Sequence, residues 1–334
     1  MLRAILASRK FIFFFFSGLI ILTAGAWAKG TTYDTAGQLS AAPENRESSS
    51  PQDEAEPKIK YPFINLLLLG LDENNVSDLM MIASYNIKTH QTFLIAIPRD
   101  TYVSGHNWWQ DAGDVQSQLC MANYVGMHPD GDYHRGAEFT ALWIEYLIEI
   151  PIHEYVSVDF NSFKELINMV GGVMLYVDPA FAEIRPGGDH AGLEPLSAGL
   201  QRLDGRQAFF YARYRGNSPE NRIPEPGSPG KDGDRIRRNQ KLLKALFEQG
   251  RSLKFLELAS ILKQVPEKVH TSLDVWDMAA LAPSVKNINA DQLVTIVLPG
   301  EFKEVYVEEI DEYTSYFYVD YEKTAAILGG FGLR

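Results

Sequence analysis

The apolar positions of the chain predict strands at the start of its globular part. An apolar run from Phe63 to Leu69 ends at Gly70, which is typical of a buried central strand. Residues 79–85 and 92–97 predict two more strands, with a turn at 86–90 between them.

Helical periods follow. Apolar residues recur at i, i+3, i+4, i+7, i+8 and i+11 from Phe139 to Ile150, which predicts an amphipathic helix packed on the sheet. The later pattern predicts a strand at 155–158, a helix capped by Asn161, a strand at 173–177, helices at 203–211, 234–249 and from 253, and strands at 293–298 and 316–319. Asp234 is the candidate N-cap of the 234–249 helix. Strands that alternate with helices predict an α/β layered domain.

The N-terminus carries an export signal. Arg3, Arg9 and Lys10 precede an uncharged run at 11–28, which places the following chain outside the cytoplasm. Its length is at the lower limit for a spanning helix, and Ala26-Trp27-Ala28 also fits signal cleavage, so an anchor and a cleaved signal are both open. Residues 29–60 are rich in small and polar residues and predict a disordered linker.

Composition and the motifs that are missing from the sequence argue against several classes of function. The formal net charge of -12 argues against general nucleic-acid binding. The single cysteine, Cys120, excludes an intrachain disulfide and leaves a Cys/His metal cluster unsupported. The chain contains no His-Glu-x-x-His, P-loop or Gly-x-Ser-x-Gly motif.

Arginine is concentrated in one stretch. Half of the sixteen arginines lie within residues 202–238, namely Arg202, Arg206, Arg213, Arg215, Arg222, Arg235, Arg237 and Arg238. Arg suits multidentate recognition of phosphate, so this cluster predicts a phosphate or pyrophosphate site. A solvated basic face that balances nearby acids is the alternative.

Two acidic segments complement the arginines. Asp72 and Asp78 follow the 63–69 strand, and Arg99-Asp100 follows the 92–97 strand. Ligand sites in α/β sheets gather at strand ends. A pair of aspartates together with phosphate oxygens makes a suitable Mg²⁺ ligand set. The combination matches what phosphoryl transfer requires.

Several motifs in order resemble the LytR-CpsA-Psr (LCP) family of bacterial cell-envelope proteins. The matching stretches are Asn65–Asp72, Ser77–Met81, Ile97–Val103, Phe163–Val173, Leu203–Gly205, Tyr211–Arg215 and Asp234–Gln240. They cover about residues 61–250, and the tail to Arg334 is similar to the usual completion of the domain. The family's single-pass anchor favours an anchor over a cleaved signal.

The resemblance implies a fold and an activity. The fold would be a mixed central sheet flanked by helices on both faces, within a catalytic domain at 61–334, with an apolar pocket for a polyprenyl chain. The enzyme would sit in the cytoplasmic membrane. It would transfer a glycopolymer with its phosphate from a polyprenyl-pyrophosphate carrier to a peptidoglycan hydroxyl, and would contact no nucleic acid.

The resemblance also assigns site residues. Asp72 and Asp78 would hold Mg²⁺. The pyrophosphate would be bound by Arg99, Arg213, Arg215, Arg235, Arg238 and Asn239, the last of which stands where the family usually has a glutamine. Asp78, Arg99 and Asp100 would be catalytic, and Asp100 would either orient Arg99 or act as a base.

The chain departs from the family pattern at three places. Val76 replaces a usual arginine, the loop at 216–233 is long, and residues 120–124 match poorly. Two alternatives therefore stay open: a non-catalytic polyprenyl-phosphate binding protein, favoured by Val76, and a polyprenyl-pyrophosphate hydrolase. The family's older label, transcriptional attenuator, conflicts with the export signal and the acidic charge.

Overall fold

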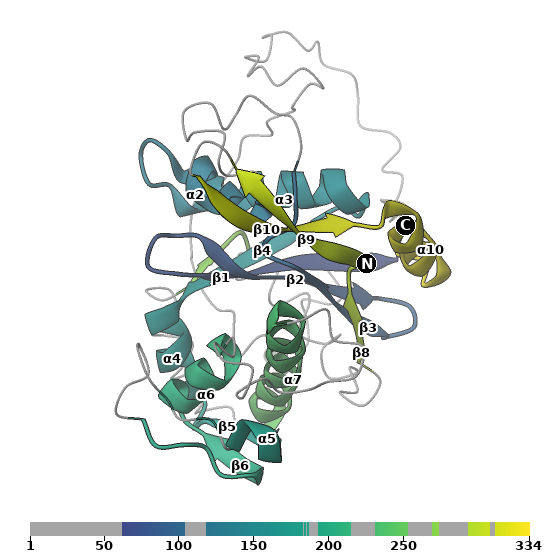
Figure 1. The fold of residues 1–334 in the computed structure, drawn as a ribbon. Helices are drawn as coiled ribbons and strands as arrows, with labels where there is room; N and C mark the ends of the chain where they lie inside the picture. Colours follow the sequence, from purple (N-terminus) through teal and green to yellow (C-terminus); the bar gives the residue numbers. More distant parts are fainter. Residues whose placement is uncertain are drawn as a thin grey trace, which may run out of the picture.

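A mixed six-stranded sheet forms the centre of the protein (Figure 1). The computed structural model describes residues 62–103, 118–182, 184, 186, 193–214, 231–252, 269–273, 293–307 and 311–334. The strand order is β7-β4-β1-β2-β3-β8. These strands are β1 (Phe63–Leu71), β2 (Ser77–Asn86), β3 (Thr92–Ile97), β4 (Glu154–Asp159), β7 (His270–Thr271) and β8 (Val294–Val297). The β1–β4 and β3–β8 pairs are parallel, and the other pairs are antiparallel.

Both faces of the sheet are covered, which explains the continuous apolar run of β1. Leu66 and Leu68 belong to the core on one face, and Leu67 and Leu69 to the core on the other. Alternate residues of a strand point to opposite faces, so a strand covered on both sides needs apolar residues at every position. The α/β fold with helices on both faces is confirmed.

One face carries the segments between β3 and β4 together with the C-terminal elements. These are the 3-10 helix η2 (Leu119–Met121), α2 (Ala122–Met127), α3 (Tyr133–Ile148), the hairpin of β9 (Gly300–Val307) and β10 (Glu312–Val319), and α10 (Tyr321–Gly330). The chain just before α3 thus contains two short helices, η2 and α2.

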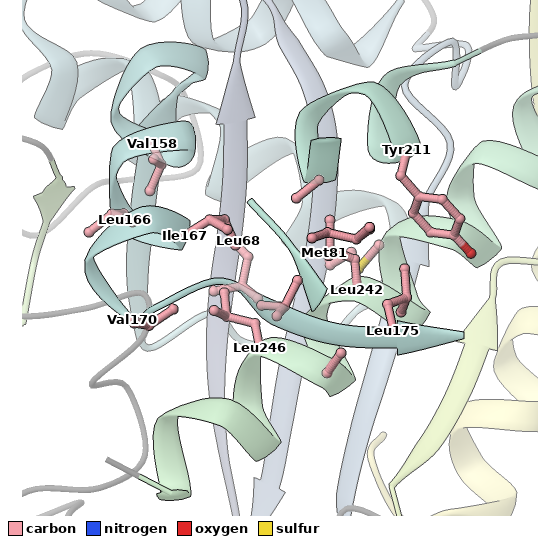
Figure 2. Close-up of a cluster of buried hydrophobic side chains, with 14 of the residues drawn as sticks. Leu68, Met81, Val158, Leu166, Ile167, Val170, Leu175, Tyr211, Leu242 and Leu246 are labelled. Carbon is pink, nitrogen blue, oxygen red and sulfur yellow. The ribbon is translucent and has the colours of Figure 1, made fainter. Parts of the chain in front are cut away.

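The opposite face carries the segments from α4 to α7. These are α4 (Phe160–Met169), β5 (Val173–Val177), α5 (Pro179–Ala182), β6 (Gly199–Leu203), α6 (Gly205–Arg213) and α7 (Lys231–Ser252). β5 and β6 pair as a separate antiparallel sheet. Figure 2 shows side chains from α4, α7 and β5 converging on Leu68 and Met81 of the central sheet.

Helix ends differ from the sequence predictions in detail. Asp159, rather than Asn161, caps α4, because its carboxylate accepts from the backbone N–H groups of residues 161 and 162. Asp204 caps α6 in a reciprocal capping box with Gln207. α7 begins at Lys231, so Asp234 lies inside its first turn and is not its N-cap.

Some sequence predictions fall outside the described residues, namely the anchor at 11–28, the linker at 29–60 and the helix from 253. Within the part of the chain that the structure describes, no helix is both long and apolar enough to span a bilayer.

Candidate active site

Asp78 is the centre of the candidate site. It is the second residue of β2, and its side chain is only 8% exposed. Arg99 donates from Nη1 to Asp78 Oδ1, and Arg235 Nη1 lies 3.8 Å from the same oxygen. Arg213 Nη2 lies 3.7 Å from Oδ2. One buried carboxylate thus gathers three guanidinium groups that the sequence spreads over more than a third of the chain.

Arg99 is held on several sides just after β3. Its Nε donates to Asp100 Oδ1 at 3.1 Å, and its Nη2 lies 3.6 Å from Cys120 Sγ. Burial lowers the pKa of Arg99, but negative charge beside it, including the carboxylates of Asp78 and Asp100, raises it by more, so the guanidinium stays charged. The carboxylate of Asp100 therefore orients Arg99 in this structure.

Cys120 is a contact that the sequence did not reveal. It is fully buried at the start of the short helices after β3. Burial raises the pKa of the Cys120 thiol to about 11, against the opposing effect of Arg99, so the thiol is neutral. Its place against Arg99 depends on the path of the chain after β3.

Arg213 and Arg235 reach Asp78 from two helices. Arg213 is the last residue of α6 and lies over the ring of Phe160, with 4.3 Å from its guanidinium carbon to the ring centroid. Such a cation–π contact fixes a planar guanidinium without neutralising it. Arg235 is nearly buried on α7. Arg99, Arg213 and Arg235 together carry three positive charges, which is one more than the carboxylates of Asp78 and Asp100 balance.

Asp72 occupies a different position in the loop between β1 and β2. Its Oδ1 accepts from the backbone N–H groups of Asn74 and Val76, both at 2.9 Å, so it stabilises the turn. Asn123 Nδ2 donates to the carbonyl of Asn75 at 2.9 Å and holds the same loop from α2. Among the described residues, no group of three or more His, Cys, Asp or Glu side chains could hold a metal ion.

An apolar pocket opens beside the cluster. It has a volume of about 90 Å³ and lies between β1, β2, α4, α6 and α7. Its lining includes Leu68, Leu79, Phe160, Phe163, Phe209 and Leu243, with Asp78, Arg213, Arg235 and Asn239 at the polar end. Asn239 is buried, and its Oδ1 has no hydrogen-bond partner within the described structure. An apolar pocket with arginine side chains at one end is suited to a ligand that has an apolar tail and an anionic head.

Arg238 and Arg215 are the other two arginines that were predicted to bind the pyrophosphate. Arg238 is buried, and its Nε donates to the carbonyl of Tyr211 at 3.0 Å while its Nη2 donates to the carbonyl of Tyr214. It therefore ties α7 to the end of α6. Arg215 lies outside the described residues.

The pocket aromatics were not predicted as site residues. Phe160 and Phe209 pack against each other with ring centroids 4.9 Å apart. The signal available in the sequence was their position, since Phe160 follows a strand directly and Phe209 stands one helical turn before Arg213. Val76, where the resemblance implies an arginine, is buried in the loop that Asp72 organises.

Comparison with known proteins places the chain in a family. The model of the LytR_cpsA_psr family matches residues 30–328. Polyisoprenyl-teichoic acid–peptidoglycan teichoic acid transferase TagV of Bacillus subtilis is 25% identical over 87% of this chain and 70% of its own length. The TagU transferase of Enterococcus faecalis is 28% identical over 70% of each chain.

Solved structures show the same fold. The crystal structure of Bacillus subtilis TagV aligns with a TM-score of 0.60 at 24% identity, covering 82% of this chain and 98% of that one. A crystal structure described as a transcriptional regulator from Enterococcus faecalis aligns with a TM-score of 0.60 at 25% identity, covering 81% and 88%. The family match extends over most of the chain, and it joins the fold and the ordered motifs: this protein is a member of the LytR-CpsA-Psr family.

Proposed function

We propose that the protein transfers a phosphate-linked glycopolymer from a polyprenyl-pyrophosphate carrier to peptidoglycan. The observation that supports this most is the pocket, whose apolar walls end at Asp78 and its three arginines. The relatives from Bacillus and Enterococcus are named as transferases that join polyisoprenyl-linked teichoic acid to peptidoglycan. Pocket and relatives therefore point to the same class of donor and acceptor.

In this proposal the arginines hold the pyrophosphate. Arg99, Arg213 and Arg235 would turn from Asp78 toward the phosphate oxygens, which carry more charge than one carboxylate. A peptidoglycan hydroxyl then attacks the phosphorus next to the glycan. The new O–P bond forms as the bridging P–O bond breaks, polyprenyl phosphate leaves with the electron pair, and the proton of the hydroxyl is released to solvent. The fixed guanidinium groups stabilise the charge that develops on the leaving phosphate.

Asp100 has a positioning role in this scheme. Its carboxylate engages Arg99 Nε and is mostly buried, so it keeps the guanidinium aimed at the site. Asn239 supplies a polar group at the boundary between pocket and cluster. An amide can present either its oxygen or its nitrogen, and we assign the nitrogen to a phosphate oxygen.

Mg²⁺ fits the donor chemistry of Asp72 and Asp78. Both offer carboxylate oxygens, and Mg²⁺ takes few protein ligands when phosphate oxygens complete its shell. Asp72 uses Oδ1 for its turn, which leaves Oδ2 for a cation. When bound, Mg²⁺ would neutralise pyrophosphate charge. The site is completed by substrate, since the described protein residues alone offer too few ligands.

The membrane setting belongs to the same proposal. The basic and then apolar N-terminus at 3–28 supports a single-pass anchor with the catalytic domain outside the cytoplasm. A lipid-linked donor requires the enzyme to work beside the bilayer.

The test is product analysis with the full chain in vesicles. The vesicles contain a polyprenyl-pyrophosphate oligosaccharide, and peptidoglycan fragments and Mg²⁺ are added. A phosphodiester-linked product detected by mass spectrometry supports the transferase. Release of sugar phosphate without linkage would instead support the hydrolase, and saturable lipid binding without turnover would support the binding protein. Omitting Mg²⁺ tests the metal separately.

A further inference from the structure

The small sheet of β5 and β6 has one apolar face exposed. Met174, Tyr176 and Leu200 are 39%, 61% and 69% exposed. Tyr176 lies directly opposite Leu200 in the register, and Met174 lies opposite Arg202, so the four side chains share the outer face. The inner face, with Val173, Leu175 and Val177, packs into the core. Large apolar groups that gather on one face of a two-stranded sheet mark an interaction surface.

This sheet is joined to two helices whose other ends line the pocket. α4 begins at Phe160 in the pocket and runs through Gly171-Gly172 into β5. β6 leads through the Asp204 cap into α6, which ends at Arg213 in the cluster. Phe160 and Arg213, which line the pocket, are therefore at one end of α4 and α6, and the two helices connect to β5 and β6 at the other end. Figure 1 shows β5 and β6 beyond that end of the helices.

The lining of the pocket indicates where the rest of a long lipid would be. Its described residues lie next to the charged cluster and include none from β5 or β6, so the pocket surrounds the part of the lipid nearest its head. The remaining hydrocarbon needs an apolar surrounding close to α4 and α6. The bilayer supplies one, provided that the protein rests on it at this end.

The charge and residue types of the face suit a bilayer surface. Tyrosine is favoured at membrane interfaces, where its ring is buried and its hydroxyl is hydrated. Arg202 donates to the carbonyl of Gly171 at 2.8 Å and pairs with no carboxylate among the described residues, so its charge is available to anionic headgroups.

We propose that the outer face of β5 and β6, formed by Met174, Tyr176, Leu200 and Arg202, docks on the membrane. This rests on the proposed lipid-linked donor. The face seats the domain with the pocket walls running toward the bilayer, so the donor enters without leaving the lipid phase. It acts in addition to an N-terminal anchor, because the long stretch at 29–60 would tether the domain without orienting it.

The direct test measures membrane depth and needs no turnover. Leu200→Cys and Leu142→Cys are each labelled with an environment-sensitive dye in the full chain, reconstituted in vesicles of phosphatidylethanolamine and phosphatidylglycerol. Leu142 on α3 is a matched control, since it is an exposed leucine (49%) on the other side of the central sheet (Figure 1). Cys120 is buried with a raised pKa, and the unsubstituted chain measures any labelling of it.

We expect lipids that carry a quencher to quench the Leu200→Cys dye several-fold more than the Leu142→Cys dye. Equal quenching, or none at either position, would overturn the proposal. Quenching that depends on protein concentration rather than on lipid would assign the face to a second copy of the chain and would also overturn it.

A second variant connects the face to lipid access. Met174→Ser with Tyr176→Ser and Leu200→Ser should slow turnover of a vesicle-embedded donor about tenfold, by weakening apolar docking. A short, water-soluble prenyl donor should be used at an unchanged rate, which also shows that the variant folds. The control, Leu142→Ser with Tyr146→Ser, should be unaffected with either donor. If the chain turned over no donor, the dye result would still decide the docking surface.

Discussion

The Nη1 atom of Arg235 lies 3.8 Å from Oδ1 of Asp78, so the beginning of α7 and the beginning of β2 meet at one carboxylate. Both side chains are buried, at 4% and 8% exposure. A buried aspartate among several guanidinium groups serves two purposes. It offsets their repulsion in the free protein, and it marks the position that a substrate anion would share.

Asp78→Ala should both stop turnover and destabilise the fold. The substitution leaves buried arginines without their carboxylate, and breaking a buried pair in this way costs about 3 kcal/mol. Urea unfolding gives the stability change, and the vesicle assay gives the turnover. Asp72→Ala is the comparison, since it loses two turn hydrogen bonds and should cost about 1–2 kcal/mol. Equal stability of Asp78→Ala and the wild type would show that the arginines do not depend on it.

Arg213→Ala should weaken binding of polyprenyl pyrophosphate about tenfold or more, because a charge-assisted contact is lost. Combining it with Arg215→Ala tests the rest of the Tyr211–Arg215 motif. Arg206→Ala is a control, since Arg206 is an exposed residue on the same helix. Calorimetric titration into detergent-solubilised protein measures the affinity. An unchanged affinity would mean that the cluster is only a basic surface.

Asp100→Asn separates orientation from base catalysis. An amide oxygen can still accept from Arg99 Nε, so an orienting role predicts a reduced rate with an unchanged shape of the pH–rate profile. If Asp100 were the base, the limb of the profile that reports its ionisation would disappear. The measurement is kcat/KM against pH for both proteins.

Gly205→Ala should destabilise the pocket wall. A Cβ at this position would lie 2.0 Å from the carbonyl oxygen of Lys164, so α4 and α6 would have to separate. Such overpacking costs about 1–3 kcal/mol. Gly329→Ala in α10 meets nothing within 4 Å and should be neutral or slightly stabilising. Thermal unfolding of the two variants makes the comparison, and a neutral Gly205→Ala would mean that the helices are not packed this closely.

His270 should make the folded protein less stable at acidic pH than at neutral pH. Burial and the neighbouring His134 lower the pKa of His270 below its ordinary value of 6.5, against the effect of Asp159. The folded form therefore keeps His270 neutral where the unfolded form binds a proton. Stability is complete above about pH 6.5 and falls as the pH drops toward the lower, folded pKa.

His270→Phe tests this pH dependence. It preserves stacking on Tyr133, whose ring centroid lies 4.0 Å away, and it removes the titrating group. The loss of Tm between pH 7 and pH 5 should become smaller, while the difference between the two proteins stays constant above pH 7. A pH dependence identical to that of the wild type would exclude His270 as its source.

The sequence predicted the strands well because their cause is local. β1, β2 and β3 are apolar runs bounded by Gly70, a turn and Pro98, and each falls within a few residues of its expected bounds. The predicted start of α7 at residue 234 was wrong. Gly233 is a poor helix former and suggested a helix end, yet in the folded protein the helix begins at Lys231.

Several of the residues named from the sequence do lie together at Asp78, but their arrangement could not be predicted from spacing. Arg235 and Arg238 share a helix face by spacing, yet Arg235 lies against Asp78 while Arg238 donates to a carbonyl at the end of α6. The contact of Cys120 with Arg99 likewise depends on tertiary packing, which no spacing in the sequence encodes. The roles of Asp72, Asn239 and the pyrophosphate arginines toward substrate stay predictions.

The parallel pairing of β3 with β8 has a consequence for how the chain can be shortened. β8 lies at the edge of the central sheet and comes late in the chain, so a product that stops after α7 would leave the backbone of β3 as an open edge. Such an edge, made of fully apolar residues such as Phe93 and Ile95, is a template for pairing with other chains. Truncation after α7 would therefore yield an aggregating fragment, and the C-terminal quarter of the chain protects the fold against self-association.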